Sequence, residues 1–368
     1  MSMYRWIMSA SLVALAAVAP SNLSLGAPAG LDQTGKPDLK SAGALAFGPK
    51  GVLFVGDPQG AQVFAIDVGT APSNPIGPGF KLEGADAKIA AFLGTKADDI
   101  AINDVVVEPG TNVAYISVSR GKGPSAEPAI VRVDGKGNVT ALPLDKVAYA
   151  KVGLSAAPAA GAQDKKGQSL RSQAITDLAF VDGKLFIAGL SNEEFASKLR
   201  SVEFPFKGSD TAASAEIFHT NHNAVETRSP VRTFVPFNVG GEPQLLAAYT
   251  CTPLVTFPVK SLKAGEKVHG KTVAELGNRN VPLDMIVYEK DGKQYLLLSN
   301  SARGVMKIST DTIEKQPALE TKVADKAGLP YETIESLKGV EQLDKVGNAN
   351  ALLLVKNNGL NLEVIALP

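Results

Sequence analysis

One short plan dominates the sequence and constrains its fold more than any other feature. Residues 282–308 read as three successive apolar strands, MIVY, YLLLSN and VMKI, joined by Asp291-Gly292 and by a second turn at Ala302-Arg303-Gly304. An Asp-Gly pair between two apolar runs predicts a tight hairpin. The same plan recurs along the chain, so we expect an array of small antiparallel sheets.

Six copies of this plan can be aligned at the start of their first strand. The aligned positions are Ala44, Asp104, Asp177, Arg232, Asp284 and Glu341. Four-strand units of roughly 40–50 residues are typical of propeller blades, and the extra length here falls in inserted loops and helices. The sequence therefore predicts an all-β, six-bladed β-propeller. A seven-bladed ring and a pair of β-sandwiches remain the alternatives.

The last copy leaves open how the ring closes. It ends at Pro368 and shows no fourth strand of its own. Propellers usually close by borrowing that strand from the other end of the chain, which points to the residues that follow the N-terminal segment. We therefore expect residues 28–40 to supply the closing strand, although their sequence has few strand-forming residues.

Three segments interrupt the repeats. Residues 86–94 have apolar residues at helical spacing, with Asp86 as a candidate N-cap and Gly94 just past the end, so we expect a short helix there. A second short helical connection is expected at residues 331–337. Residues 145–171 are rich in Ala, Gly, Lys and Gln and favour a long exposed loop.

Composition excludes several classes of function. The chain has 368 residues with 37 basic and 37 acidic side chains, and this balance argues against nucleic-acid or anionic-membrane binding. Cys251 is the single cysteine, so an intramolecular disulfide is impossible, and the CxxCH signature of attached haem is absent. Motifs of P-loop, zinc-peptidase and serine-hydrolase enzymes are absent as well.

The first 27 residues have the features of an export signal. Arg5 precedes a short apolar run that is followed by small residues up to Ala27. No later stretch reaches the roughly 18 apolar residues of a membrane span. We expect residues 1–27 to be a cleaved signal, residues 28–368 to be one propeller domain, and the mature protein to be periplasmic or secreted.

The expected blade geometry gathers acidic residues at one mouth of the channel. Inner strands begin on one face, which would bring together Asp104, Asp177, Asp284 and Glu341, with Arg232 in the same ring. Carboxylates crowded together need protons, cations or a metal, and such oxygen ligands suit Ca²⁺. Structural Asx turns or Asp–Arg pairing are the alternatives.

A second set of residues at this mouth predicts ligand binding. Arg120 and Arg303 occupy equivalent turns, Asn300 lies beside the second turn, and Arg232 stands in the inner ring. A guanidinium group matches the geometry of carboxylate or phosphate, so this set predicts an anionic ligand.

The repeat plan resembles six-bladed propellers of the NHL and gluconolactonase/paraoxonase kind. The resemblance covers most of the chain from residue 28 onward at the level of architecture, since the WD and kelch signatures are missing. Gluconolactonase- and paraoxonase-like propellers hold a catalytic Ca²⁺ near the channel mouth with acidic and Asn ligands. The resemblance thus implies a similar metal position here.

Two further side-chain groups deserve a chemical interpretation. His219 and His222 form an i, i+3 pair, but no third metal ligand is evident nearby in the sequence, which favours a loop or hydrogen-bonding role. Cys251 in a strand is typical of a small buried residue rather than a nucleophile.

Two functions follow from these patterns. The favoured one is an exported propeller that binds a small molecule or a protein partner at its channel face. The alternative is a Ca²⁺-dependent hydrolase resembling lactonases, with the metal in the channel mouth.

Overall fold

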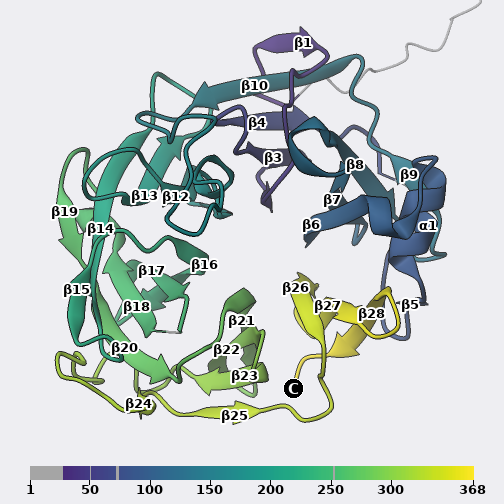
Figure 1. The fold of residues 1–368 in the computed structure, drawn as a ribbon. Helices are drawn as coiled ribbons and strands as arrows, with labels where there is room; N and C mark the ends of the chain where they lie inside the picture. Colours follow the sequence, from purple (N-terminus) through teal and green to yellow (C-terminus); the bar gives the residue numbers. More distant parts are fainter. Residues whose placement is uncertain (1–27, 50, 72–73, 252) are drawn as a thin grey trace, which may run out of the picture.

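We describe the protein from a computed structural model that defines residues 28–49, 51–71, 74–251 and 253–368. The expected export signal lies outside these residues. Six sheets, with antiparallel pairing except at one outer strand, stand around a central channel, so the chain is a six-bladed β-propeller, as the repeat pattern predicts (Figure 1). Within the described ranges, no helix combines the length and the apolar character needed to cross a membrane.

The blades are numbered here by the order of their innermost strands in the chain, and each is given from the channel outward. Blade 1 contains β2 (Leu45–Phe47), β3 (Val52–Asp57), β4 (Gln62–Asp67), β10 (Val147–Gly153) and β1 (Gln33–Gly35). Blade 2 contains β6 (Ile100–Val107), β7 (Ala114–Arg120), β8 (Glu127–Val133) and β9 (Val139–Ala141). Blade 3 contains β11 (Asp177–Val181), β12 (Lys184–Leu190), β13 (Ser197–Glu203), β14 (Thr211–His219) and β15 (Ala224–Glu226), with β19 (Lys267–His269) parallel to β14.

The other three blades follow the same plan. Blade 4 contains β16 (Val231–Val239), β17 (Glu242–Tyr249), β18 (Pro253–Pro258), β20 (Lys271–Leu276) and β24 (Lys326–Gly328). Blade 5 contains β21 (Pro282–Lys290), β22 (Lys293–Asn300), β23 (Gly304–Ser309) and β25 (Tyr331–Thr333). Blade 6 contains β26 (Val340–Val346), β27 (Asn350–Lys356), β28 (Leu360–Ala366) and β5 (Lys81–Leu82).

Helical structure is confined to α1 (Ala85–Phe92) and to four single 3₁₀ turns, η1 (Ala97–Asp99), η2 (Gly123–Ser125), η3 (Arg171–Gln173) and η4 (Val259–Ser261), in the described part of the chain. The predicted helix near residue 86 is confirmed, and Gly94 follows it with φ of 70°. Its N-cap, however, is Gly84, and Asp86 instead accepts a 3.0 Å hydrogen bond from the Leu360 amide of blade 6.

The predicted tight hairpins are present. Asp182-Gly183 and Asp291-Gly292 join the first two strands of blades 3 and 5, and Gly240-Gly241 does so in blade 4. All six residues have positive φ, between 50° and 82°. Two consecutive residues with positive φ make the type I′ turn that matches the twist of paired strands, which explains the choice of Asp-Gly and Gly-Gly.

The blades do not follow the ring in chain order. Contacts between innermost strands place blade 2 between blades 6 and 1, and blade 1 between blades 2 and 3 (Figure 1). The chain builds four strands of blade 1, β1 to β4, supplies β5 to blade 6 and builds blade 2, and then returns with β10, which lies between β1 and β4 in blade 1. The alignment of the copies could not predict that β5 belongs to blade 6 and β10 to blade 1. It compares only the hairpins within each copy, and these two strands pair with other parts of the chain.

The closing strand corrects one expectation. It is β5 at Lys81–Leu82, which pairs with β28, and it does not come from residues 28–40. Those residues instead supply β1, the outermost strand of blade 1. Two other segments also become outer strands: the expected helix at 331–337 contains β25, and the expected loop at 145–171 begins with β10. In each case the strand is stabilised by a partner outside its own segment.

The hydrophobic core lies between neighbouring blades. One cluster joins blades 1 and 3, another blades 1 and 2, another blades 5 and 6, and the largest spans blades 3, 4 and 5. The cluster between blades 2 and 6 also includes α1 and Leu82 of β5. Each sheet therefore buries both faces against its neighbours, and the ring depends on every blade being present.

The closing strand gives a direct test of this architecture. Leu82 is 3% exposed, and we expect Leu82→Ala to lower the free energy of unfolding by about 2–5 kcal/mol, as for other large-to-small core changes. Urea unfolding measures the change. The matched control is Lys81→Ala in the same strand, because Lys81 forms an exposed ion pair with Glu363 and should change stability by about 0.5 kcal/mol or less. Equal losses for both variants would contradict the assigned closure.

Candidate functional site

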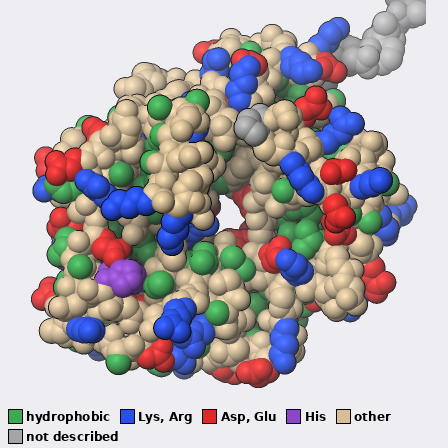
Figure 2. Space-filling view, viewed as in Figure 1, with side chains coloured by type: hydrophobic (Ala, Val, Ile, Leu, Met, Phe, Trp, Pro, Cys, Tyr) green, Lys and Arg blue, Asp and Glu red, His purple; other side chains and the backbone are tan. Residues whose placement is uncertain are grey.

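Four aspartates from four inner strands face the central channel. Asp104 lies on β6, Asp177 on β11, Asp284 on β21 and Asp344 on β26, and all four line a cavity of about 610 Å³. Figure 2 shows the opening in the middle of the molecule, with acidic side chains on its wall. The sequence predicted the first three of these residues.

Each aspartate links two blades. The Oδ2 atom of Asp104 accepts a hydrogen bond from the Leu45 amide of the next blade at 2.6 Å, and the Oδ1 atom accepts one from Val105. The other three repeat this arrangement, with inter-blade amide donors at Phe234 for Asp177, Leu343 for Asp284 and Val107 for Asp344, at 2.7, 2.9 and 2.7 Å. These links connect blades 2 and 1, 3 and 4, 5 and 6, and 6 and 2. The Asx-type structural role considered from the sequence is therefore present at all four positions.

The carboxyl groups have unusually high proton affinity. Burial raises the pKa of Asp104 and of Asp177 to about 7 and that of Asp344 to about 6, although the backbone hydrogen bonds act in the opposite direction. Burial and the nearby charge of Asp104 also raise the pKa of Asp284 well above its usual value. The four buried carboxyl groups are too poorly solvated to be fully ionised at the same time. The channel therefore carries less negative charge near neutral pH than four ionised aspartates would give it.

The structure corrects the fourth member of the predicted ring. Glu341 is partly exposed and forms an ion pair with Lys356 at 3.6 Å, while Asp344 faces the channel in its place. A β-bulge between Val340 and Gln342 turns the side chain of Glu341 out of the register of the strand, so Gln342 takes the position equivalent to Asp104. Asp344 lines the channel two residues further along β26.

Equivalent bulges occur in β6, β16 and β21, at Asn103, Arg232 and Leu283. Arg232 is therefore one residue out of register with the aspartates, and Thr233 occupies the equivalent position in β16. An alignment made without the bulge places Arg232 in the acidic ring. No described atom pairs Arg232 with any of the four aspartates, so the predicted Asp–Arg pairing is not formed there.

Arg232 lines a second hollow, of about 630 Å³, at the end of the channel where the inner strands begin. Ala44, Asn103 and Thr176 line this hollow, and the next residue of each strand lines the channel. The segment between β10 and β11 contributes further polar groups. The polar lining includes Gln59, Asn103, Ser119, Gln168, Ser172 and Gln173. The loop expected to be merely exposed thus forms one wall of the hollow.

The other residues of the predicted ligand set have partners of their own. Arg120 pairs with Glu127 at 3.1 Å, and Arg303 lies 3.5 Å from Asp325. Asn300 is buried, donates to Asn280 and accepts from the amides of Ala302 and Arg303, so it holds its turn together. Of the four predicted ligand-binding residues, only Arg232 lines the hollow.

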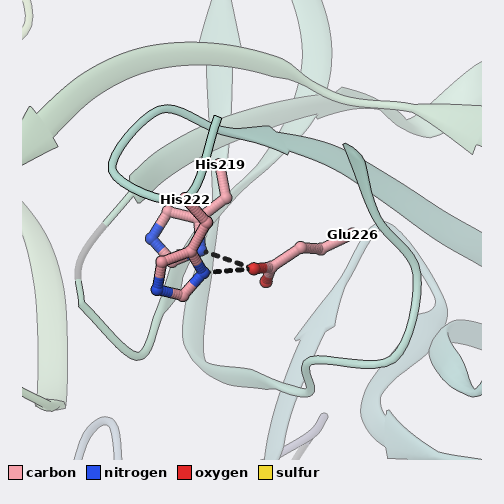
Figure 3. Close-up of side chains that lie close together, drawn as sticks. All are labelled: His219, His222 and Glu226. Carbon is pink, nitrogen blue, oxygen red and sulfur yellow. Dashed lines mark hydrogen bonds and ion pairs between the residues drawn. The ribbon is translucent and has the colours of Figure 1, made fainter. Parts of the chain in front are cut away.

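The two histidines have the third partner that the sequence did not reveal. His219 and His222 both point Nδ1 at Oε1 of Glu226 (Figure 3). The signal was present as the spacing His-x₂-His-x₃-Glu, but only the hairpin between β14 and β15 brings Glu226 back to His219. Cys251 lies outside this group, in the turn after β17, with φ of 62°.

The likenesses between this chain and known proteins are distant. No protein-family model matches the chain, and no curated protein matches it. Among solved structures, a glucose dehydrogenase aligns at a TM-score of 0.34 and 11% identity over 91% of this chain and 98% of its own. The Kuenenia stuttgartiensis hydrazine synthase aligns at 0.32 and 11%, over 90% and 97%, and a GH43 glycoside hydrolase at 0.37 and 9%, over 73% and 52%. Likenesses this distant carry no argument about activity.

The channel carboxyl groups predict a pH dependence of stability. In the folded protein Asp104 and Asp177 keep their protons to about pH 7 and Asp344 keeps its proton to about pH 6, whereas an unfolded aspartate releases its proton near pH 3.8. Between these pH values the folded protein binds more protons than the unfolded chain, and this proton binding stabilises the fold fully only below the unfolded pKa. The free energy of unfolding should therefore fall as the pH rises from about 5 to about 8. Urea unfolding at constant ionic strength measures it, and Asp177→Asn should flatten the slope. A stability that rises over this range would refute the assignment.

Proposed function

We propose that the protein is an exported propeller that binds a small anionic, hydrogen-bonding molecule in the hollow at the channel mouth. Arg232 is the residue that anchors the ligand in this proposal. The amide and hydroxyl side chains around it would contact the uncharged part of the molecule.

The state of Arg232 is the observation that carries the proposal. Its side chain is half-buried, burial lowers its pKa, and it remains the cation of the hollow because guanidinium groups stay protonated in proteins. It forms no ion pair or hydrogen bond with any described residue. A partly desolvated cation has lost interactions with water, and Arg232 has no counterion to replace them. A bound anion would supply that missing interaction.

The polar lining narrows the class of ligand. Gln59, Gln168 and Gln173 offer both donors and acceptors, whereas few apolar side chains line the hollow. A molecule that combines a carboxylate with several hydroxyl groups fits these partners better than an apolar one. The raised pKa values of the channel aspartates support the proposal further, because their protonated forms repel an incoming anion less.

The hydrolase alternative would require Ca²⁺ at the four channel aspartates. Both oxygens of each carboxylate already accept a backbone hydrogen bond, which favours the binding function. The pH series separates the two: Ca²⁺ binding favours ionised carboxylates, so added Ca²⁺ would raise the unfolding midpoint at about pH 8 if the metal bound there.

Gluconate is a suitable probe because it joins a carboxylate to a chain of hydroxyl groups, and glucose is its neutral counterpart. We expect gluconate to bind the protein and Arg232→Gln to weaken this binding roughly tenfold or more, the usual value of a hydrogen bond to a charged group. Isothermal titration calorimetry measures both. Arg303→Gln is the matched control, because that arginine has its own acidic partner and should leave the affinity unchanged.

The same titration can contradict the proposal in two ways. Equal affinity of gluconate for the protein and for Arg232→Gln would remove the anchor. Tighter binding of glucose than of gluconate would assign the hollow to neutral ligands. If the proposal is right, gluconate affinity should also rise as the pH falls from about 8 to about 6 and the channel aspartates gain protons.

A further inference from the structure

A compact group of metal-ligating side chains lies in blade 3, away from the hollow. His219 ends β14, His222 lies in the turn that follows, and Glu226 ends β15 (Figure 3). The ligand atoms of the three residues all lie within 4.8 Å of one another.

The hairpin itself aims these side chains at one point. Glu226 pairs with Ile217 and Ala224 pairs with His219, so Glu226 and His219 lie diagonally on the same face of the ladder. Asn223 has φ of 52°, which tightens the turn. His222 consequently folds back over the hairpin, and its ring centre lies 3.9 Å from that of His219.

The distances show convergence on a single carboxylate oxygen. Nδ1 of His222 lies 2.5 Å and Nδ1 of His219 lies 3.1 Å from Oε1 of Glu226. The other oxygen, Oε2, accepts a 2.7 Å hydrogen bond from the hydroxyl of Ser229, which fixes the orientation of the carboxylate. An outer-shell hydrogen bond of this kind is typical of carboxylates that bind metals.

His219 supplies an independent indication of a ligand. Its side chain is 2% exposed, and its Nε2 atom has no hydrogen-bonding partner among the described residues. Buried polar atoms are normally satisfied, so an imidazole left in this state needs an explanation. His222, by contrast, is 53% exposed and gives the group an open side toward solvent.

We propose that His219, His222 and Glu226 bind a divalent transition-metal ion of the Zn²⁺ class. Two imidazoles and a carboxylate are ligands that this class of ion prefers, whereas Ca²⁺ and Mg²⁺ prefer oxygen atoms alone. The three protein ligands leave one coordination position toward the exposed side of His222, where water or a small ligand binds. The site is separate from the hollow at Arg232, so neither proposal depends on the other.

Cobalt is the most informative probe, because tetrahedral Co²⁺ has a visible absorption spectrum that octahedral Co²⁺ in water lacks. The untagged mature protein, freed of metal by chelation, should take up one Co²⁺ with this spectrum, and one equivalent of Zn²⁺ should abolish it. Zn²⁺ should also raise the midpoint of thermal unfolding, as any ligand of the folded state does.

Three variants test the proposed site and a fourth is the matched control. His222→Ala and Glu226→Gln should each weaken Zn²⁺ binding at least tenfold, and Ser229→Ala should weaken it about tenfold by releasing the carboxylate. His269→Ala is the control: His269 also lies 3.1 Å from a carboxylate, that of Glu216, but without a second histidine, so the affinity should not change. His222 is exposed, so its variant should keep the metal-free unfolding midpoint of the parent protein.

The outcomes distinguish a metal site from a hydrogen-bonded cluster. An octahedral Co²⁺ spectrum, or Zn²⁺ affinity that is the same in the parent protein and His222→Ala, would overturn the proposal. The three side chains would then be a hydrogen-bonded hairpin cluster only.

Discussion

The inter-blade hydrogen bonds of the channel aspartates are the interaction on which the ring depends most. In the described residues no ladder of backbone hydrogen bonds joins the inner strands of neighbouring blades, so apolar packing alone would fix their relative positions only loosely. Asp104, Asp177, Asp284 and Asp344 remove this freedom at four junctions, since each carboxylate holds amides from two inner strands. The same arrangement places four acidic groups around one narrow channel, where burial and mutual repulsion disfavour their ionised forms. Their raised pKa values are the result.

The same arrangement explains why the candidate binding residues lie where they do. The inner strands are fixed at the aspartates, and the residue just before an aspartate is displaced by a bulge in β6 and β21 and by the equivalent bulge in β16. Arg232 and Asn103 reach the hollow from these bulges. Rigid strands thus carry the ligand-facing side chains, and the loop between β10 and β11 completes the wall.

Much of the fold was predictable because its signals are local. Asp-Gly and Gly-Gly turns together with apolar runs predicted the blades and their number. The helix near residue 86 was predicted from its own local spacing of apolar residues. The bulge at Glu341 was not predictable, because one displaced residue leaves no mark on an apolar pattern. Short strands such as β5 and β25 were missed because distant partners stabilise them. Glu226 was missed for a similar reason, since its contact with His219 requires the hairpin to form.

The exchange between blades 1, 2 and 6 has a consequence for how the chain reaches its folded state. The Gly84 amide donates to Asn361, 277 residues away, and β10 completes blade 1 only after blade 2 has been built. The strand edges of β4 and β5 therefore remain unpaired until β10 and β28 have been synthesised. Pairing between strands so far apart in the sequence is slow. Unpaired strand edges are prone to self-association during that interval. Once folded, β5 and the Gly84–Asn361 hydrogen bond join the early part of the chain to the last blade.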